Sequence, residues 1–106
     1  MKPLPKPYQQ FGEEYPAVYA AYENLGTAAA NAGPLDAKTR ELVKLGMAAA
    51  YGSESGVQSH THRALEAGAS ADEIRHTLLL GINTLGFSTM MAALTWARHA
   101  LASNSG

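Results

Sequence analysis

The sequence predicts an all-α fold, a five-helix antiparallel bundle. Apolar residues recur at the spacings of helices that bury one face. No stretch alternates at period two with β-branched residues, so no strand is predicted. The turns between the helices are short, and short turns favour antiparallel neighbours. At 106 residues the chain fits one all-α domain over residues 11–106, after an extended proline-rich arm over residues 1–10.

The amino-terminal residues are expected to be extended because Pro3, Pro5 and Pro7 alternate with lysine and leucine. This segment has no apolar core, so it does not have the pattern of a signal peptide. The first helix is then predicted from about Pro16 to Asn31, with its proline in the first turn.

Two helices are predicted on either side of a serine- and glycine-rich turn in the middle of the chain. Asp36 is the expected N-cap of a helix that runs to about Tyr51, where Gly52 ends it. The run Ser55–Gln58 has the form of a capping box. It is expected to open a third helix that Gly68 ends.

Two further helices complete the predicted bundle. The run Ser70–Glu73 is a second capping box and opens a fourth helix, which Gly86 breaks. Ser88 is expected to cap a fifth helix that runs to about Ala102.

The last two helices carry apolar residues on more than one side. Their main stripes are Ile74, Leu78, Ile82 and Leu85 on the fourth helix, and Met90, Leu94, Ala97 and Leu101 on the fifth. Leu79, Leu80 and Trp96 lie off these stripes. Helices that are apolar on several sides must be covered on several sides, so we expect a homo-oligomer. Surface leucines without such a role are the alternative.

The composition excludes several classes of function. A net charge of −1 argues against a nucleic-acid footprint and against a polybasic membrane patch. The chain has no cysteine, which excludes disulfides, thiolate catalysis and cysteine-ligated metals. The most apolar run, Leu78–Leu94, is interrupted by glycine and polar residues and falls short of the roughly 20 apolar residues of a membrane span. We expect a soluble cytoplasmic protein.

Glu41 is the acidic residue that helical periodicity brings nearest to buried side chains. It shares a side of its helix with Leu45 and Ala48, while Arg40 and Lys44 mark the polar side. A carboxylate at the edge of a buried face must be paired, hydrogen-bonded or protonated, and such environments are typical of proton-transfer sites. A surface ion pair with Arg40 or Lys44 is the alternative.

His60 is the matching imidazole on the third helix. It flanks the apolar stripe Val57, Thr61 and Ala64 and is expected to point inward, as a catalytic group or as a hydrogen-bonded core residue. His62 is expected on the solvent side. One helix cannot present both imidazoles to the same ion, so no metal site is predicted from this pair.

The candidate substrate-binding residues are Ser53, Ser55 and Gly56, in the turn between the two helices. The serines are capping residues first, but a helix N-terminus with small side chains can also hold a carboxylate. A serine nucleophile would need an adjacent base, and no nucleophile-elbow motif supports a hydrolase.

Several segments together resemble one known superfamily. They are Glu41–Val43, Tyr51–Ser53, His60, Arg63–Ala69, Glu73–Ile74 and Gly86–Phe87. They resemble the carboxymuconolactone decarboxylase and alkyl hydroperoxidase D-like superfamily over roughly residues 35–101. The resemblance implies an all-helical fold whose members assemble as trimers or hexamers.

The peroxidase branch of this superfamily uses a glutamate, a C-x-x-C pair with an internal histidine, and a later histidine as a proton relay to a thiol. The resemblance puts Glu41 and His60 at the positions of the glutamate and the later histidine. Ser53 and Gly56 take the two cysteine positions, and Ser55 takes that of the internal histidine. Serine lacks the acidity and redox chemistry of a thiol, so thiol-based peroxide reduction is not available.

The decarboxylase branch also lacks these cysteines and works without metal or organic cofactor, and this sequence resembles it better. Charged residues usually flank its turn where Ser53 and Gly56 stand here. The resemblance therefore implies a divergent lyase or isomerase without cofactor, acting on a small carboxylic acid or lactone. Glu41 and His60 would be catalytic. The alternatives are a non-catalytic binding or structural module on the same fold, and a metal site formed by His60 with Glu41.

Overall fold

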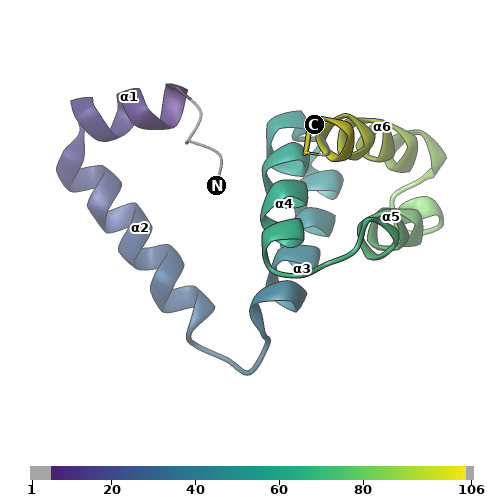
Figure 1. The fold of residues 1–106 in the computed structure, drawn as a ribbon, viewed down its shortest axis with the longest axis horizontal. Coiled ribbons are helices and arrows are strands. Elements are labelled where there is room, and N and C mark those ends of the chain that lie inside the picture. Colours follow the sequence, from purple (N-terminus) through teal and green to yellow (C-terminus); the bar gives the residue numbers. More distant parts are fainter. Residues whose placement is uncertain (1–5, 105–106) are drawn as a thin grey trace. The chain divides into compact units, whose positions relative to one another are not determined.

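The computed structural model describes residues 6–104, which form helices and turns without a strand in that range (Figure 1). The elements are α1 (Lys6–Glu14), α2 (Pro16–Ala30), α3 (Ala37–Tyr51), α4 (Glu54–Glu66), α5 (Ala71–Leu79), the 3₁₀ turn η1 (Leu80–Ile82) and α6 (Phe87–Asn104). The all-α prediction is confirmed. The predicted number of five helices is wrong, because residues 6–104 contain six α-helices.

The chain divides into two compact units, residues 1–34 and residues 35–106. The division between these units lies after α2. The expected extended arm is helical over residues 6–10, the first part of α1, and its residues 1–5 lie outside the described residues. Pro7 is compatible with a helix because it lies in the first turn, where a backbone N–H has no intrahelical partner.

In the first unit, α1 and α2 are joined by aromatic contacts. The ring centroid of Phe11 lies 5.6 Å from that of Tyr15 and 6.3 Å from that of Tyr19. The Tyr19 ring also packs over Gly12, where a Cβ atom would lie at an ordinary contact distance of 3.5 Å from the ring. The helix predicted from Pro16 to Asn31 agrees with α2 to within one residue.

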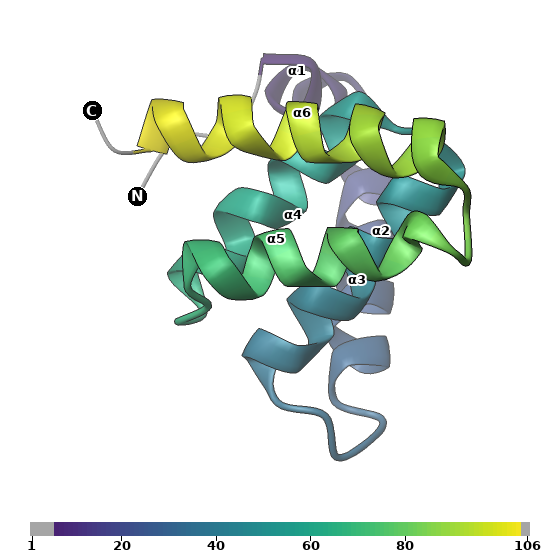
Figure 2. The same ribbon diagram turned by 90° about the vertical axis from the view of Figure 1, so that its right-hand side faces the viewer.

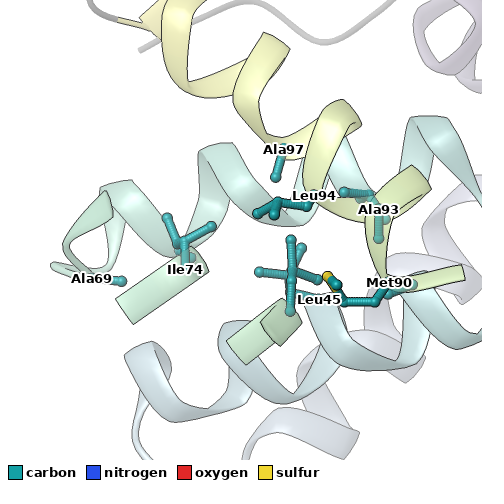
Figure 3. Close-up of a cluster of buried hydrophobic side chains, with 11 residues drawn as sticks. Leu45, Ala69, Ile74, Met90, Ala93, Leu94 and Ala97 are labelled. Carbon is teal, nitrogen blue, oxygen red and sulfur yellow. The ribbon is translucent and has the colours of Figure 1, made fainter. Parts of the chain in front are cut away.

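The second unit has an apolar core to which α3, α4, α5 and α6 all contribute. Leu45, Val57 and Ile74 are fully buried, and Ala93 and Ala97 of α6 close the cluster (Figure 3). Helix α6 contacts both α4 and α5, and α3 contacts α4 (Figure 2). Each fully buried leucine, isoleucine or valine contributes about 1.5–3 kcal/mol through the removal of its apolar surface from water. This core fixes α3 against α4.

Both ends of α3 and the start of α5 follow the predicted capping chemistry. The Asp36 carboxylate accepts the amide of Thr39 at 2.8 Å, and Gly52 ends the helix in the left-handed region with φ 78°. Ser70 and Glu73 form the predicted reciprocal capping box of α5.

Three predicted helix boundaries are wrong. Helix α4 is capped by Ser53 and not by Ser55, so it starts earlier than expected. Helix α5 ends at Leu79 and not at Gly86, since the chain tightens into η1 directly after it. Helix α6 begins at Phe87, which puts Ser88 inside the helix and not at its cap.

Candidate functional site

The turn between α3 and α4 is short and fixed by backbone hydrogen bonds. The amide of Ser53 donates to the carbonyl of Ala48 at 3.1 Å, directly after the left-handed Gly52. Ser53 is extended, and its Oγ accepts the amide of Gly56 at 3.0 Å. Only the cap residues Gly52 and Ser53 separate the two helices, and so short a turn makes them antiparallel neighbours.

Gly56 lies where the first turn of α4 approaches α3 closely. A Cβ atom at this position would lie 2.8 Å from Oγ of Ser53 and 3.2 Å from Cβ of Ala48. Real Cβ atoms do not come that close to a neighbour, so a side chain here requires Ser53 to move. Glycine at position 56 therefore sets the spacing of the helix pair at the turn.

Further along the same helix pair, Glu41 and His60 meet. Oε1 of Glu41 lies 2.8 Å from Nδ1 of His60, across 19 residues of sequence. The side chains are 18% and 21% exposed respectively, so both are largely enclosed but reachable from solvent. The alternative partners of Glu41 are excluded, because Arg40 donates to the carbonyl of Leu35 at 2.7 Å and Lys44 has no ion pair with another described residue.

This bond fixes the chemistry of the imidazole. An ionised carboxylate can only accept, so Nδ1 of His60 carries the hydrogen that it donates to Glu41. Nε2 then carries the lone pair of the neutral ring and can take up a proton. The hydrogen bond to Glu41 also fixes the orientation of the ring, so that Nε2 faces away from the carboxylate. The pair has the composition of a general acid/base site.

Ser53 and Gly56 lie on the face of α4 that carries His60, whereas Ser55 does not. Counting about 100° per residue, Ser53 and Gly56 both fall within about 40° of His60, and Ser55 is about 140° away. Ser55 is also exposed. The structure therefore brings two of the three predicted binding residues to the side of the pair. His62, expected on the solvent side, is half-buried.

The described part of the chain was also compared with the requirements of a metal site and of a membrane-spanning helix. Within residues 6–104 no group of three or more histidine, aspartate or glutamate side chains is arranged to hold a metal ion. In the same range no helix combines the length and apolarity that would let it cross a membrane.

An apolar hollow of about 360 Å³ lies on the other side of α3, between that helix and the α5–η1 segment. Its lining includes Met47, Ala50, Leu80 and Leu85, and it does not include the Glu41–His60 pair. Met47 and Leu80 are 64% and 61% exposed. The sequence predicts Leu80 as apolar surface that needs a cover, but Met47 was not predicted as part of that surface. Val43 and Met47, four residues apart on one helix, form an apolar pair that could have indicated it.

Residues 16–99 match the family model of the carboxymuconolactone decarboxylase family. The chain belongs to the carboxymuconolactone decarboxylase family. The superfamily resemblance found in the sequence is therefore confirmed.

The chain is also similar to an individual curated protein. An uncharacterized protein of Haemophilus influenzae is 42% identical over 59 residues, which cover 56% of this chain and 52% of that protein. The chain thus aligns with about half the length of this curated relative.

Two solved structures of the carboxymuconolactone decarboxylase family share the fold. One is the apo form of a family protein from Legionella pneumophila, with a TM-score of 0.80, 24% identity, and coverage of 92% of this chain and 87% of that one. The other is a candidate carboxymuconolactone decarboxylase from Burkholderia xenovorans, with a TM-score of 0.74, 27% identity, and coverage of 97% and 84%. The present chain has no cysteine.

Proposed function

We propose that this protein is a lyase or isomerase that needs no metal or organic cofactor and acts on a small carboxylic acid or lactone. His60 is the general acid/base, and Glu41 orients its ring. The observation that carries the proposal is the 2.8 Å hydrogen bond between Oε1 of Glu41 and Nδ1 of His60. It leaves Nε2 as the nitrogen that exchanges protons with a substrate.

The reaction follows from proton transfer at Nε2. In an isomerase, Nε2 takes a proton from the carbon between a carbonyl group and a C=C double bond. The resulting dienolate receives that proton at the far carbon of the former double bond, and the double bond moves into conjugation with the carbonyl group. In a decarboxylase, the substrate loses CO₂ and keeps the electron pair on carbon, where protonated Nε2 delivers its proton. Solvent then restores the imidazolium. Neither route needs an oxidant or a reductant.

The turn at the start of α4 is the proposed binding element. Ser53 uses an oxygen lone pair to cap the helix at Gly56 and keeps its O–H for a substrate oxygen. The amide of Ser55 lies in the first turn of α4, where backbone N–H groups have no intrahelical partner and favour an anion. Gly56 keeps this end of the site free of side-chain bulk.

Hydrogen exchange in D₂O tests the proposal across a range of small acids and lactones. A panel of small lactones and keto acids is incubated with the protein, and ¹H NMR follows the loss of C–H signals or the loss of the carboxylate. We expect catalysed exchange or decarboxylation of at least one compound, and its loss in His60→Gln. Turnover that persists in His60→Gln would show that this assignment is wrong.

The second candidate function is a non-catalytic binding or structural module. The observation that favours it is that the Glu41–His60 pair joins two helices and is about four-fifths enclosed. In that case Glu41→Gln lowers thermal stability and changes no ligand response. A thermal shift with a small carboxylate that disappears in Glu41→Gln would count against this alternative.

We also propose that the protein is a cytoplasmic homotrimer or homohexamer. The support is apolar surface: Met47, Leu80 and Phe87 are each more than half exposed. Self-association would cover it. Light scattering that shows a folded monomer at micromolar concentration would contradict this proposal.

A further inference from the structure

Lys44 lies on α3 between Glu41 and Ala48, two residues of that helix that lie against α4. It follows Glu41 by three positions and precedes Ala48 by four, so all three lie within about 60° of one another around the helix axis. Glu41 contacts His60, and Ala48 lies beside Gly56. The fully buried Leu45 is on the other side of Glu41. Lys44 therefore flanks the Glu41–His60 bond on the side away from the core.

The charge of Lys44 is not matched by any described residue. Lys44 is half-buried, and within residues 6–104 it makes no hydrogen bond and no ion pair. Lys38 on the same helix is also half-buried, but it donates to Oε2 of Glu73 at 3.0 Å. Partial burial of a charge without a partner costs free energy, and an anion from outside the chain would offset that cost.

We propose that Lys44 binds the anionic group of the substrate, so that the Glu41–His60 site selects carboxylates over neutral lactones. This inference rests on the proposed function of His60 and adds its substrate class. Helices α3 and α4 are antiparallel, so a step along α3 from Glu41 to Lys44 leads toward Ser53. In this proposal Lys44 binds the carboxylate on the Ser53 side of the pair, and Nε2 of His60 reaches the reacting carbon.

Arg63 is the cation at the corresponding position of α4, three residues after His60. A step from His60 to Arg63 leads away from Ser53, toward the other end of the helix pair. Arg63 is exposed and lies in the last turn of α4, where a positive charge interacts favourably with the helix dipole. Arg63 is therefore the alternative carboxylate-binding residue, which the test compares with Lys44.

The test compares a charged ligand with a neutral one of the same shape. The probes are paraconate, a γ-lactone that carries a carboxylate, and its methyl ester. Their affinities are measured by NMR titration of the His60 imidazole in the full-length protein and in Lys44→Met, Lys44→Arg, Lys38→Met and Arg63→Met. Methionine keeps the apolar stem, and circular dichroism verifies that each variant is folded.

We expect the wild type to bind paraconate at least about tenfold more tightly than the ester, the effect of one hydrogen bond to a charged group. Lys44→Met should remove this preference without changing the affinity for the ester. Lys44→Arg should retain it, and Lys38→Met should behave as the wild type. The assignment is overturned if Lys44→Met keeps the preference, if Arg63→Met alone removes it, or if the wild type shows none.

The proposed roles of His60 and of Lys44 can be refuted independently of each other. His60→Gln should lose proton exchange while it keeps the preference for paraconate, measured by calorimetric titration. If His60→Gln keeps proton exchange, the role of His60 is wrong, and the affinities of the Lys44 variants still decide whether Lys44 binds the carboxylate.

Discussion

The carboxylate of Glu41 and the imidazole of His60 are hydrogen-bonded at 2.8 Å between two different helices. The contact depends on the α3–α4 turn, where Ser53 caps one helix and Gly52 ends the other. The turn sets the register of the two helices, and the register brings an acid and an imidazole together. The cap residues of this turn therefore help to position the two side chains of the candidate site.

The first prediction separates the roles of the two groups. General acid/base catalysis by a positioned side chain contributes about 10²–10⁴-fold, so His60→Gln should lower any proton-exchange rate by that amount. Glu41→Gln keeps a hydrogen-bonding side chain but no longer fixes the ring with a group that can only accept, so its rate should fall less. Steady-state rates in D₂O give both values. His99→Gln, which changes an exposed histidine of α6, should leave the rate unchanged.

The second prediction concerns the space at Gly56. Gly56→Ala places a Cβ atom 2.8 Å from Oγ of Ser53, so Ser53 must move and its cap weakens. Overpacking of this kind costs about 1–3 kcal/mol, which chemical denaturation measures as a lower free energy of unfolding.

Gly46→Ala is the matched control for Gly56→Ala. Gly46 lies within α3, and a Cβ atom added there would have no described atom of a neighbouring element within 4 Å. Alanine there should raise the free energy of unfolding by about 0.5–1 kcal/mol, because glycine is the poorer helix former. Equal destabilisation by both changes would contradict the close-approach argument.

The sequence predicts the elements that depend on local chemistry. The caps at Asp36 and Ser70 and the stop at Gly52 are readable because each uses residues close in sequence. The sequence favours Ser55 as the cap of α4 because two serines compete there, and only the observed backbone selects Ser53. Periodicity also places Glu41 and His60 on inward faces. It cannot pair them, since a contact across 19 residues depends on helix register.

The third prediction concerns Thr61, which is fully buried beside His60 in sequence. Its Oγ1 has no hydrogen-bond partner among the described residues, and a buried hydroxyl without a partner costs about 1–3 kcal/mol. Thr61→Val keeps the shape and removes the hydroxyl, so the free energy of unfolding should rise by about 1 kcal/mol.

Thr77→Val provides the contrast for Thr61→Val. Oγ1 of Thr77 donates to the carbonyl of Glu73 at 2.8 Å, so this substitution removes an existing hydrogen bond. Urea denaturation of the two variants should give shifts of opposite sign. A loss of stability in Thr61→Val would mean that its hydroxyl is satisfied in solution.

The fourth prediction is a loss of stability in acid that arises at two helix starts. The hydrogen bond from the Thr39 amide holds the pKa of Asp36 below its usual 3.8. The hydrogen bond from the Ser70 amide, followed by that from Lys38, holds the pKa of Glu73 below its usual 4.5. In the folded protein each carboxylate accepts these hydrogen bonds in its charged form. Its contribution to the stability is therefore complete at pH values above the pKa that it has in the unfolded chain.

That stabilisation must disappear as the pH falls through the lowered pKa values, because the folded protein then takes up the protons that the unfolded chain already holds. Thermal unfolding between pH 7 and pH 2 should show the loss beginning below the usual pKa of Glu73, 4.5, and continuing below that of Asp36, 3.8. Glu73→Gln and Asp36→Asn should each flatten part of this pH dependence, and together more than either alone. Lys38→Met should lessen the part due to Glu73 without removing it, since Ser70 still donates to that carboxylate. It should lessen the part due to Asp36 to a smaller degree, because the charge of Lys38 also lowers the pKa of Asp36. An unchanged pH dependence in the double variant would place the acid sensitivity elsewhere in the chain.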